Sequence, residues 1–430
     1  MSTMAGAHGS ADRREVGRSL GKPMNIALII HELLVEGGGE RQCVSLARAL
    51  ARQGHDVTLY TSVYDRANCF PDICKDVTVR EVGRGRMPWL RKPFFLRGYL
   101  DMLHLAAAVG VRHEIWNPHH WPAQWGAVWL KPKLGGKVVW MCNDVPNFWE
   151  KARASWLRTP WYRLQYAYDR AQNRKVDLTL FLSNWAESGF RAIYDGSTLV
   201  VRSGADPERF APGGEGAKIR SRFHLQPDDF VLLWLGIFMP HRRLEDAIQA
   251  IQLVPRNARV KLLLAGSDRS YPAYLASLRD LAKRLEVENE VIFAGKVADE
   301  EIRDFYCSCD TFLFPNENQT WGLAVLEAMA CGRPVLVSQG AAVHEILTDQ
   351  ETAILFPARD PAVLAQRIEW LAANSQLRQE IAQRGMTLAR TTYNWSRFAD
   401  QVTEACQKVL RGEQSLKDEL QVAARPTQDR

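Results

Sequence analysis

Residues 315–334, PNENQTWGLAVLEAMACGRP, begin as a polar loop, pass through Gly322 and continue as an apolar helical pattern. One acid, Glu327, stands in the second turn of that pattern. A helix that starts beside a strand presents free backbone N–H groups at the positive end of its dipole, which favours an anion such as a phosphate. A carboxylate one turn deeper can accept hydrogen bonds from a vicinal diol. The stretch therefore predicts a site for the diphosphate and ribose of a nucleotide sugar.

Strands and helices alternate on both sides of this stretch. Short apolar runs bounded by turn residues predict ten strands, at 25–30, 57–61, 114–117, 137–141, 178–182, 230–235, 260–265, 291–293, 311–314 and 335–337. A helix is predicted at 40–52, and the chain has helical spacing from about 360 to 412. Residues 203–229 are rich in Gly, Pro and charge and mark a domain boundary. The pattern predicts an α/β protein with two Rossmann-like, doubly wound domains that face each other across a cleft.

Composition favours a cytoplasmic protein. The 46% hydrophobic and 24% charged residues are ordinary for a globular chain. No apolar run reaches the roughly 18 residues of a spanning helix, and residues 1–23 lack the apolar core of a secretory signal. The eight scattered cysteines suit buried thiols in a reducing compartment.

Basic and aromatic residues gather in two segments. Residues 84–97, RGRMPWLRKPFFLR, hold five basic residues and no acid, and residues 149–175 repeat the theme. Such surfaces suit an anionic membrane, which would place the protein peripherally on its inner face. Single-stranded nucleic acid would also be accommodated, although we expect no nucleic-acid partner. For 149–175, a solvated helix face with an aromatic core side explains the pattern equally well.

A glycine loop follows the first predicted strand. Its pattern, Gly37-x-Gly39-x-x-Gln42, lacks the third glycine of the dinucleotide fingerprint, which disfavours a nicotinamide enzyme. Gly38 and Gly39 still stand where a backbone can closely approach a bulky ligand, so we expect them at the donor site.

Taken in order, these segments resemble the retaining glycosyltransferases of family four (group 1), which have the GT-B fold and include sucrose synthases and bacterial phosphatidylinositol mannosyltransferases. The resemblance spans roughly residues 24–410. Its carriers are EGGGERQCVSLARALARQGHDVTLYTS, VVRSGADPERF, LLLAGSD, VIFAGKVADEEIRDFYCSCDTFLFP and QTWGLAVLEAMACGRPV. Residues 40–70 are also similar, more weakly, to the eukaryotic mannosyltransferase that extends the lipid-linked core oligosaccharide, which favours mannose.

The resemblance implies a domain plan. Residues 1–23 would be a disordered tail, 24–203 the acceptor-side domain, 204–385 the nucleotide-sugar-binding domain, 386–412 C-terminal helices and 413–430 a polar tail. The implied reaction moves a hexose, with configuration retained, from a nucleotide-diphosphate sugar to a glycan or lipid-linked acceptor in cell-surface polysaccharide or glycolipid synthesis. No cofactor is implied, and the sequence shows no spacing typical of a metal site. The alternative is a non-catalytic GT-B protein that binds a nucleotide sugar or glycan.

The family's glutamate pair falls on this first segment, with a departure. Its second member is Glu327, which in relatives binds the ribose, and its first position is Gln319 in this chain. Glutamine keeps an acceptor but loses the charge, and Glu317 could compensate. The diphosphate would be held by three backbone N–H groups, those of Gly322, Leu323 and Ala324.

A basic pair and an acceptor side complete the implied site. Where relatives have an arginine, this chain has Ile237, while Arg242 matches their lysine and Arg243 could supply the missing cation. Together with Glu327, Arg242 and His119 are the expected catalytic residues, His119 standing at a strand end beside His120. The remaining expected residues are Asn143 and Asp144 on the acceptor side and Glu345 facing the donor.

Overall fold

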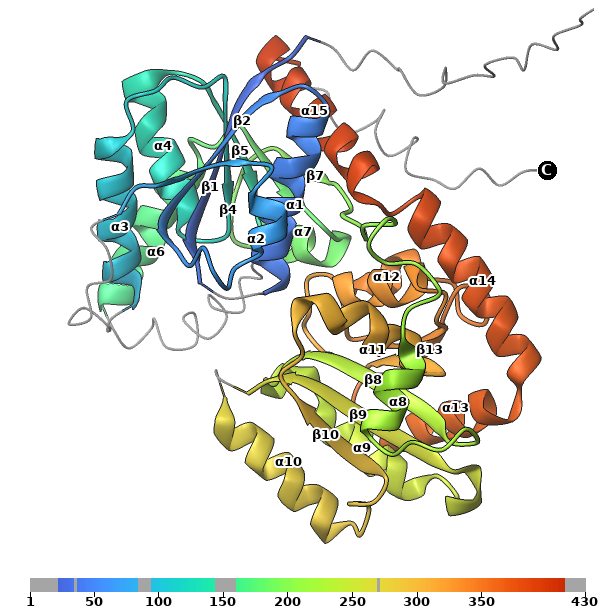
Figure 1. Ribbon diagram of the computed structural model, residues 1–430. Helices are drawn as coiled ribbons and strands as arrows, with labels where there is room; N and C mark the ends of the chain where they lie inside the picture. The colour runs from blue at the N-terminus through green and yellow to red at the C-terminus, as the bar shows by residue number, and fades with distance from the viewer. Residues whose placement is uncertain (1–21, 35–36, 84–93, 144–159, 269–270, 414–430) are drawn as a thin grey trace, which may run out of the picture.

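The computed structural model describes residues 22–34, 37–83, 94–143, 160–268 and 271–413. Two parallel sheets organise the chain, as the sequence predicts (Figure 1). The seven strands of the first sheet are β1 (Asn25–Leu33), β2 (Asp56–Tyr64), β3 (Thr78–Glu81), β4 (Ile115–His119), β5 (Lys137–Met141), β6 (Leu178–Phe181) and β7 (Thr198–Val200). The six strands of the second are β8 (Phe230–Ile237), β9 (Val260–Ser267), β10 (Val291–Gly295), β11 (Thr311–Phe314), β12 (Val335–Ser338) and β13 (Ile354–Phe356).

Helices cover both sheets. Those of the first half are α1 (Gly38–Arg52), α2 (Pro71–Cys74), α3 (Phe94–Ala108), α4 (Ala123–Leu134), α6 (Pro160–Asn173) and α7 (Asn184–Arg191). Those of the second half are α8 (Gly216–Arg222), α9 (Leu244–Leu253), α10 (Pro272–Arg284), α11 (Ile302–Ser308), α12 (Leu323–Ala330), α13 (Pro361–Ala373), α14 (Ser375–Thr391) and α15 (Trp395–Arg411). Short 3-10 turns include η1 (Pro240–Arg242), η3 (Asp299–Glu301) and η4 (Ala342–Ile346). The central strands are buried almost completely, as both faces of a helix-covered parallel sheet should be.

Each sheet reverses its strand order once. The first has the order β3-β2-β1-β4-β5-β6-β7, so the chain changes direction between β1 and β4. The second has the order β10-β9-β8-β11-β12-β13 and changes direction between β8 and β11. Open α/β sheets bind ligands outside the carboxyl ends of their strands at this switch point. The topology therefore gives each half one place where loops can hold a ligand.

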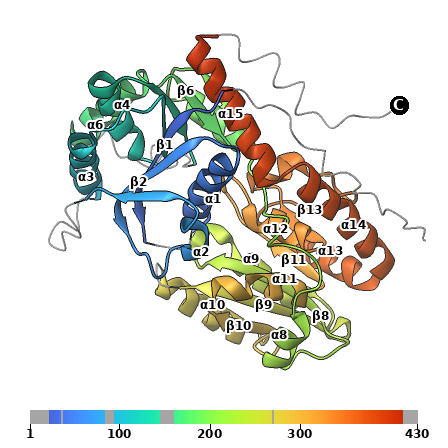
Figure 2. The same ribbon diagram turned by 45° about the horizontal axis from the view of Figure 1, so that its top comes forward.

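The C-terminal helices connect the two halves. Helix α14 packs against α12 of the second half, and α15 packs against α1 of the first (Figure 2). Polar contacts fix the second junction, because Gln53 donates to Asp400 at 2.7 Å and His55 hydrogen-bonds Thr403 at 3.1 Å. Because α15 returns to pack on the first half, it limits how far the two halves can separate.

The strand predictions are confirmed, with two kinds of difference. Most observed strands extend one to three residues beyond the predicted runs, because polar residues such as Glu32 and Ser267 still pair in the sheet. The edge strands β3, β7 and β13 were not predicted, because β3 is mostly exposed and the other two have only three residues. Within the described residues, no helix has the length and apolarity needed to cross a membrane.

Candidate functional site

A cavity of about 610 Å³ lies between the two switch points. From the first half it is lined by the glycine loop after β1 and by residues that follow β2, β4 and β5. From the second half it is lined by the ends of β8, β9 and β11 and by the start of α12. Nine of the residues expected from the sequence line it, namely Gly38, Gly39, Asn143, Arg242, Gln319, Gly322, Leu323, Ala324 and Glu327.

The start of α12 lines the cavity and has a glycine as its N-cap. Gly322 is its N-cap, and no side chain of the described residues hydrogen-bonds to cap it. A β-carbon at Gly322 would lie 2.8 Å from Cγ1 of Val343, so glycine lets the helix start pack closely against that residue. The first N–H groups of this helix therefore remain available at the positive end of its dipole.

Glu327 lies one turn into α12 with 6% of its surface exposed. Its Oε2 accepts a hydrogen bond of 2.8 Å from the hydroxyl of Tyr306, and its Oε1 lies 3.9 Å from Nε of Arg41. Tyr306 is itself fully buried, and burial together with the neighbouring Glu327 charge raises the pKa of that phenol. The carboxylate is thus held in a fixed orientation at the cavity wall.

Arg41 joins the two halves of the molecule at this wall. It belongs to α1, yet it forms an ion pair with Asp299 of the second half. Asp299 also pairs with Arg209 at 2.8 Å. Burial opposes the charge of Arg41, but Glu327 and Asp299 outweigh this and raise the pKa of the guanidinium. The network ties the orientation of Glu327 to contact between the halves.

Arg242 and Gln319 form the floor at the second switch point. The Arg242 Nη1 donates to Oε1 of Gln319. Burial lowers the pKa of Arg242 to about 10, so the guanidinium stays charged at neutral pH. Ile237, at the end of β8, lines the same cavity and contributes no charge. The resemblance implies two cations and an acid at these positions. In this chain a single arginine, Arg242, is oriented by a neutral amide, Gln319.

Arg243 and Glu317 lie off the cavity and have other partners. Arg243 makes a two-pronged ion pair with Asp246, at 2.7 and 2.9 Å, and contacts Glu245 at 2.8 Å. Glu317 pairs with Arg359 at 2.9 Å. The compensating roles expected of Arg243 and Glu317 thus have no support in the cavity geometry.

The two neighbouring histidines after β4 differ. His119 has no exposed surface, and its Nε2 hydrogen-bonds Oδ1 of Asn117 at 3.0 Å. Burial, and then the neighbouring His120, lower the pKa of His119 to about 3, so its ring is neutral. His120 lines the cavity beside the glycine loop, where a β-carbon on Gly39 would lie 2.1 Å from its Nε2. Gly39 therefore makes room for His120, a residue the sequence named only as a neighbour.

Of the described residues expected on the acceptor side and at residue 345, only one is found at the cavity. Asn143 lines the cavity, whereas Asp144 lies outside the described residues. Glu345 lies away from the cavity and caps α7 from the other half, accepting from the backbone N–H groups of Asn184 and Trp185 at 2.9 and 2.8 Å. In this structure its contacts serve the junction between the halves.

Sequence reasoning missed Arg41, Asp299 and Asn316 among the lining residues. Arg41 follows the glycine loop on α1, which is a usable signal for a cavity residue. Asp299 and Asn316 stand in loops after β10 and β11, so strand-end position alone would have nominated them.

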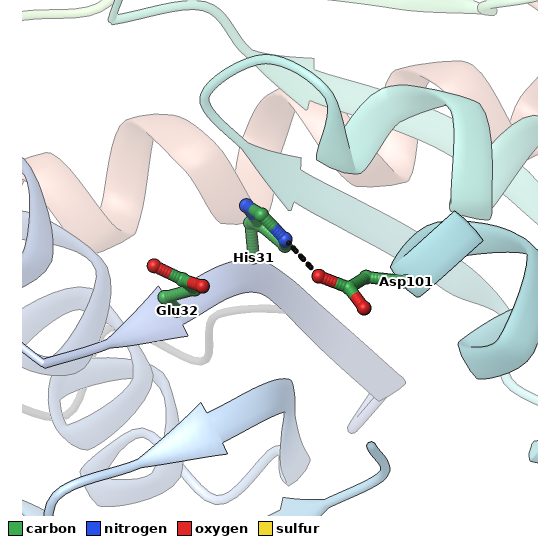
Figure 3. A group of neighbouring side chains, drawn as sticks. All are labelled: His31, Glu32 and Asp101. Carbon is green, nitrogen blue, oxygen red and sulfur yellow. Dashed lines mark hydrogen bonds and ion pairs between the residues drawn. The ribbon is translucent and has the colours of Figure 1, made fainter. Parts of the chain in front are cut away.

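A second polar cluster joins the end of β1 to α3 (Figure 3). The ring of His31 points at Asp101, with 2.8 Å between Nε2 and Oδ2, and the Glu32 carboxylate lies to one side. These three could hold a metal by proximity. Arg97 already supplies a cation, because it pairs with Glu32 and lies 3.6 Å from Asp101. Arg97 also closes the basic segment 84–97, whose residues 84–93 lie outside the described part of the chain.

Two family models match consecutive parts of the chain. The model "Glycosyltransferase Family 4" matches residues 36–209, and "Glycosyl transferases group 1" matches residues 217–387. The first match covers β2 to β7 of the first sheet, and the second covers all six strands of the second sheet.

Individual relatives agree with these models. The D-inositol 3-phosphate glycosyltransferase of Kineococcus radiotolerans is 26% identical over 87% of this chain and 91% of its own length. That of Streptomyces bingchenggensis is 26% identical, but over only 51% of this chain and 49% of its own length. Among solved structures, Anabaena Alr3699/HepE in complex with UDP and glucose superposes with a TM-score of 0.74, at 18% identity, over 90% of this chain and all of that one. The chain therefore belongs to the family 4 (group 1) glycosyltransferases, retaining enzymes of the GT-B fold that transfer a sugar from a nucleotide-sugar donor.

Proposed function

We propose that this protein transfers a hexose, with a lean toward mannose, from a nucleotide-diphosphate sugar to a glycan or lipid-linked acceptor in cell-surface polysaccharide or glycolipid synthesis. The observation that carries the proposal is that Arg242, the start of α12 and Glu327 line one cavity. Two of the similar structures hold UDP or UDP-glucose, which supports a donor of this chemical class.

The geometry suggests a division of labour during transfer. The N–H groups at the start of α12 and the Arg242 guanidinium would stabilise the diphosphate as the bond to the sugar breaks. Glu327 would accept hydrogen bonds from the ribose hydroxyls. Among the described residues three carboxylates line the cavity and no two are unpaired, because Glu327 and Asp299 contact Arg41 and Asp65 accepts hydrogen bonds from Asn68. We therefore favour front-face transfer, in which an oxygen of the departing phosphate accepts the proton of the acceptor hydroxyl.

A donor panel tests the proposal. The full-length protein would be incubated with UDP-glucose, UDP-galactose, UDP-N-acetylglucosamine and GDP-mannose, and release of nucleoside diphosphate measured with and without a bacterial glycolipid extract. We expect one donor to raise the melting temperature, because a ligand of the native state stabilises it, and to release diphosphate faster with acceptor present. If a donor binds but no nucleoside diphosphate is released, with or without extract, the result would indicate the non-catalytic alternative. Gln319 and Ile237, which depart from the family pattern, are the residues that make this alternative worth testing.

A further inference from the structure

Asn316 is a buried amide in the cavity wall to which the proposed transfer assigns no role. It follows β11 at the second switch point and has no exposed surface. Neither its Oδ1 nor its Nδ2 has a hydrogen-bond partner among the described residues, although it lines the cavity. Leaving a buried amide without partners costs free energy, so such a group in a native fold calls for an explanation, such as a ligand.

A second asparagine shows what a structural role looks like in this protein. Asn117, also without exposed surface, donates from Nδ2 to the carbonyl of Val139 at 2.6 Å and accepts at Oδ1 from the His119 ring. Both ends of that amide are satisfied by the protein. Asn316 differs from Asn117 because neither end of its amide has a partner among the described residues, a property that it shares at the cavity with Asn143 of the first half.

The loop that carries Asn316 is held rigidly. The N–H of Glu317 donates to the His241 carbonyl at 2.9 Å, and the N–H of Asn318 donates to the Gly340 carbonyl at 2.9 Å. Gln319 closes the loop through its own carbonyl, which accepts from Ala342 at 2.9 Å. The amide of Asn316 is therefore preorganised toward the cavity, which lowers the entropy cost of binding a ligand there.

The position of Asn316 indicates which part of a donor it would meet. The start of α12 and Glu327 account for the diphosphate and the ribose. The sugar must extend from the diphosphate toward the first half, where the acceptor would lie beside His120 and Asn143. Asn316, at the strand ends beside the Arg242–Gln319 pair, borders that path. A planar amide offers donors and an acceptor that match sugar hydroxyls without adding charge.

We infer that Asn316 hydrogen-bonds hydroxyl groups of the transferred sugar and that this sugar is uncharged. The inference rests on the proposed function, since it assumes a nucleotide-sugar donor. Gln319 then serves as a positioning residue, because its Oε1 orients Arg242 toward the diphosphate. Because position 319 holds an amide in place of the expected acid, the polar side chains of this loop that line the cavity, Asn316, Gln319 and Thr320, are all uncharged.

The test compares a nucleotide with its sugar conjugate. Affinities of the full-length protein for UDP and UDP-glucose, and for GDP and GDP-mannose, would be measured by isothermal titration calorimetry in the wild type and in Asn316→Leu. We expect the nucleoside diphosphate to bind equally well and the sugar nucleotide to bind roughly tenfold more weakly in the variant. Equal weakening of both ligands, or weakening of neither, would overturn the assignment.

Melting temperatures and a second variant distinguish loss of a ligand contact from loss of stability. The melting temperature of Asn316→Leu should equal or exceed that of the wild type, whereas Asn117→Leu should lower it, because only Asn117 has protein partners to lose. A fall for Asn316→Leu would indicate a structural amide. Asn316→Ser, which keeps one hydroxyl, should give an intermediate affinity and carries the comparison if the leucine variant does not fold.

The charge of the sugar is tested on the wild type. The hexose nucleotide should bind more tightly than the matching uronate, UDP-glucuronate or GDP-mannuronate, and the reverse order would overturn the uncharged sugar. Failure of the proposed function gives a different result: the wild type would bind no sugar nucleotide, or would bind one without releasing nucleoside diphosphate in the donor panel.

Discussion

At the switch point of the first sheet, Asn117 has both ends of its amide bonded to the protein, and Asn117 and His119 are buried away from the cavity, whereas at that of the second sheet Asn316 and Arg242 face it. Both places are strand ends of parallel sheets, so the backbone offers each the same opportunity. The first half contributes a close-fitting glycine loop and the amide of Asn143, which has no partner among the described residues. The second half leaves polar groups directed at a ligand. The difference indicates that donor recognition resides mainly in the second half.

The largest expected effect tests that assignment at Glu327. In Glu327→Gln we expect kcat/KM for sugar transfer to fall on the order of a hundredfold, about 3 kcal/mol, because the ribose loses a charged acceptor. Near-normal size should preserve the packing against Tyr306. Steady-state kinetics with the donor found in the panel would measure the change.

Glu300→Gln is the matched control for that variant. Glu300 is an exposed acid of the same half, in η3, and does not line the cavity. Its substitution should leave the rate near that of the wild type. Equal rates of sugar transfer for the Glu327 and Glu300 variants would contradict the assignment of the ribose site to α12.

The next comparison separates two adjacent arginines. Arg242→Ala should weaken binding of nucleoside diphosphate roughly tenfold to a hundredfold, since hydrogen bonds to charged groups are the stronger kind. Arg243→Ala should change it by no more than about twofold, because Arg243 is paired with Asp246 outside the cavity. Titration calorimetry on both variants measures the contrast, and a larger loss for Arg243 would reverse the roles of the two arginines.

This pair shows how far the sequence could lead. Alternating apolar runs predicted both sheets, and the glycine before an apolar pattern predicted the helix start at Gly322, which lines the cavity. The sequence could not distinguish Arg242 from Arg243, because their roles depend on whether a carboxylate such as Asp246 lies within reach after folding. The sequence also could not predict that Arg41, from the first half, contacts Glu327. Such pairings are set by tertiary packing, whereas strand and helix patterns are local.

The same reasoning applies to Gln319 and Asn316. A glutamine in place of an acid is visible in the sequence, but only the folded loop shows its Oε1 orienting Arg242. Asn316 gives no pattern at all, since an asparagine after a strand is usually part of a turn. What distinguishes it is complete burial without a partner among the described residues, which is a property of the fold.

The smallest expected effect concerns the sealed histidine of the first half. The pKa of His119 is lowered to about 3 in the folded protein from 6.5. Between these values the unfolded chain binds a proton that the folded chain excludes, so this residue's contribution to stability is complete above pH 6.5 and is lost as the pH falls toward 3. Urea unfolding from about pH 4.5 to 7 would measure the free energy of unfolding of the wild type and of His119→Gln. We expect this free energy to fall more steeply for the wild type as the pH is lowered, by up to about 1.4 kcal/mol per pH unit. If the stability of the two proteins has the same pH dependence, the His119 ring takes up its proton in the folded state, as an imidazole open to the cavity would. The contrast between a sealed first switch point and an open second one would then not hold.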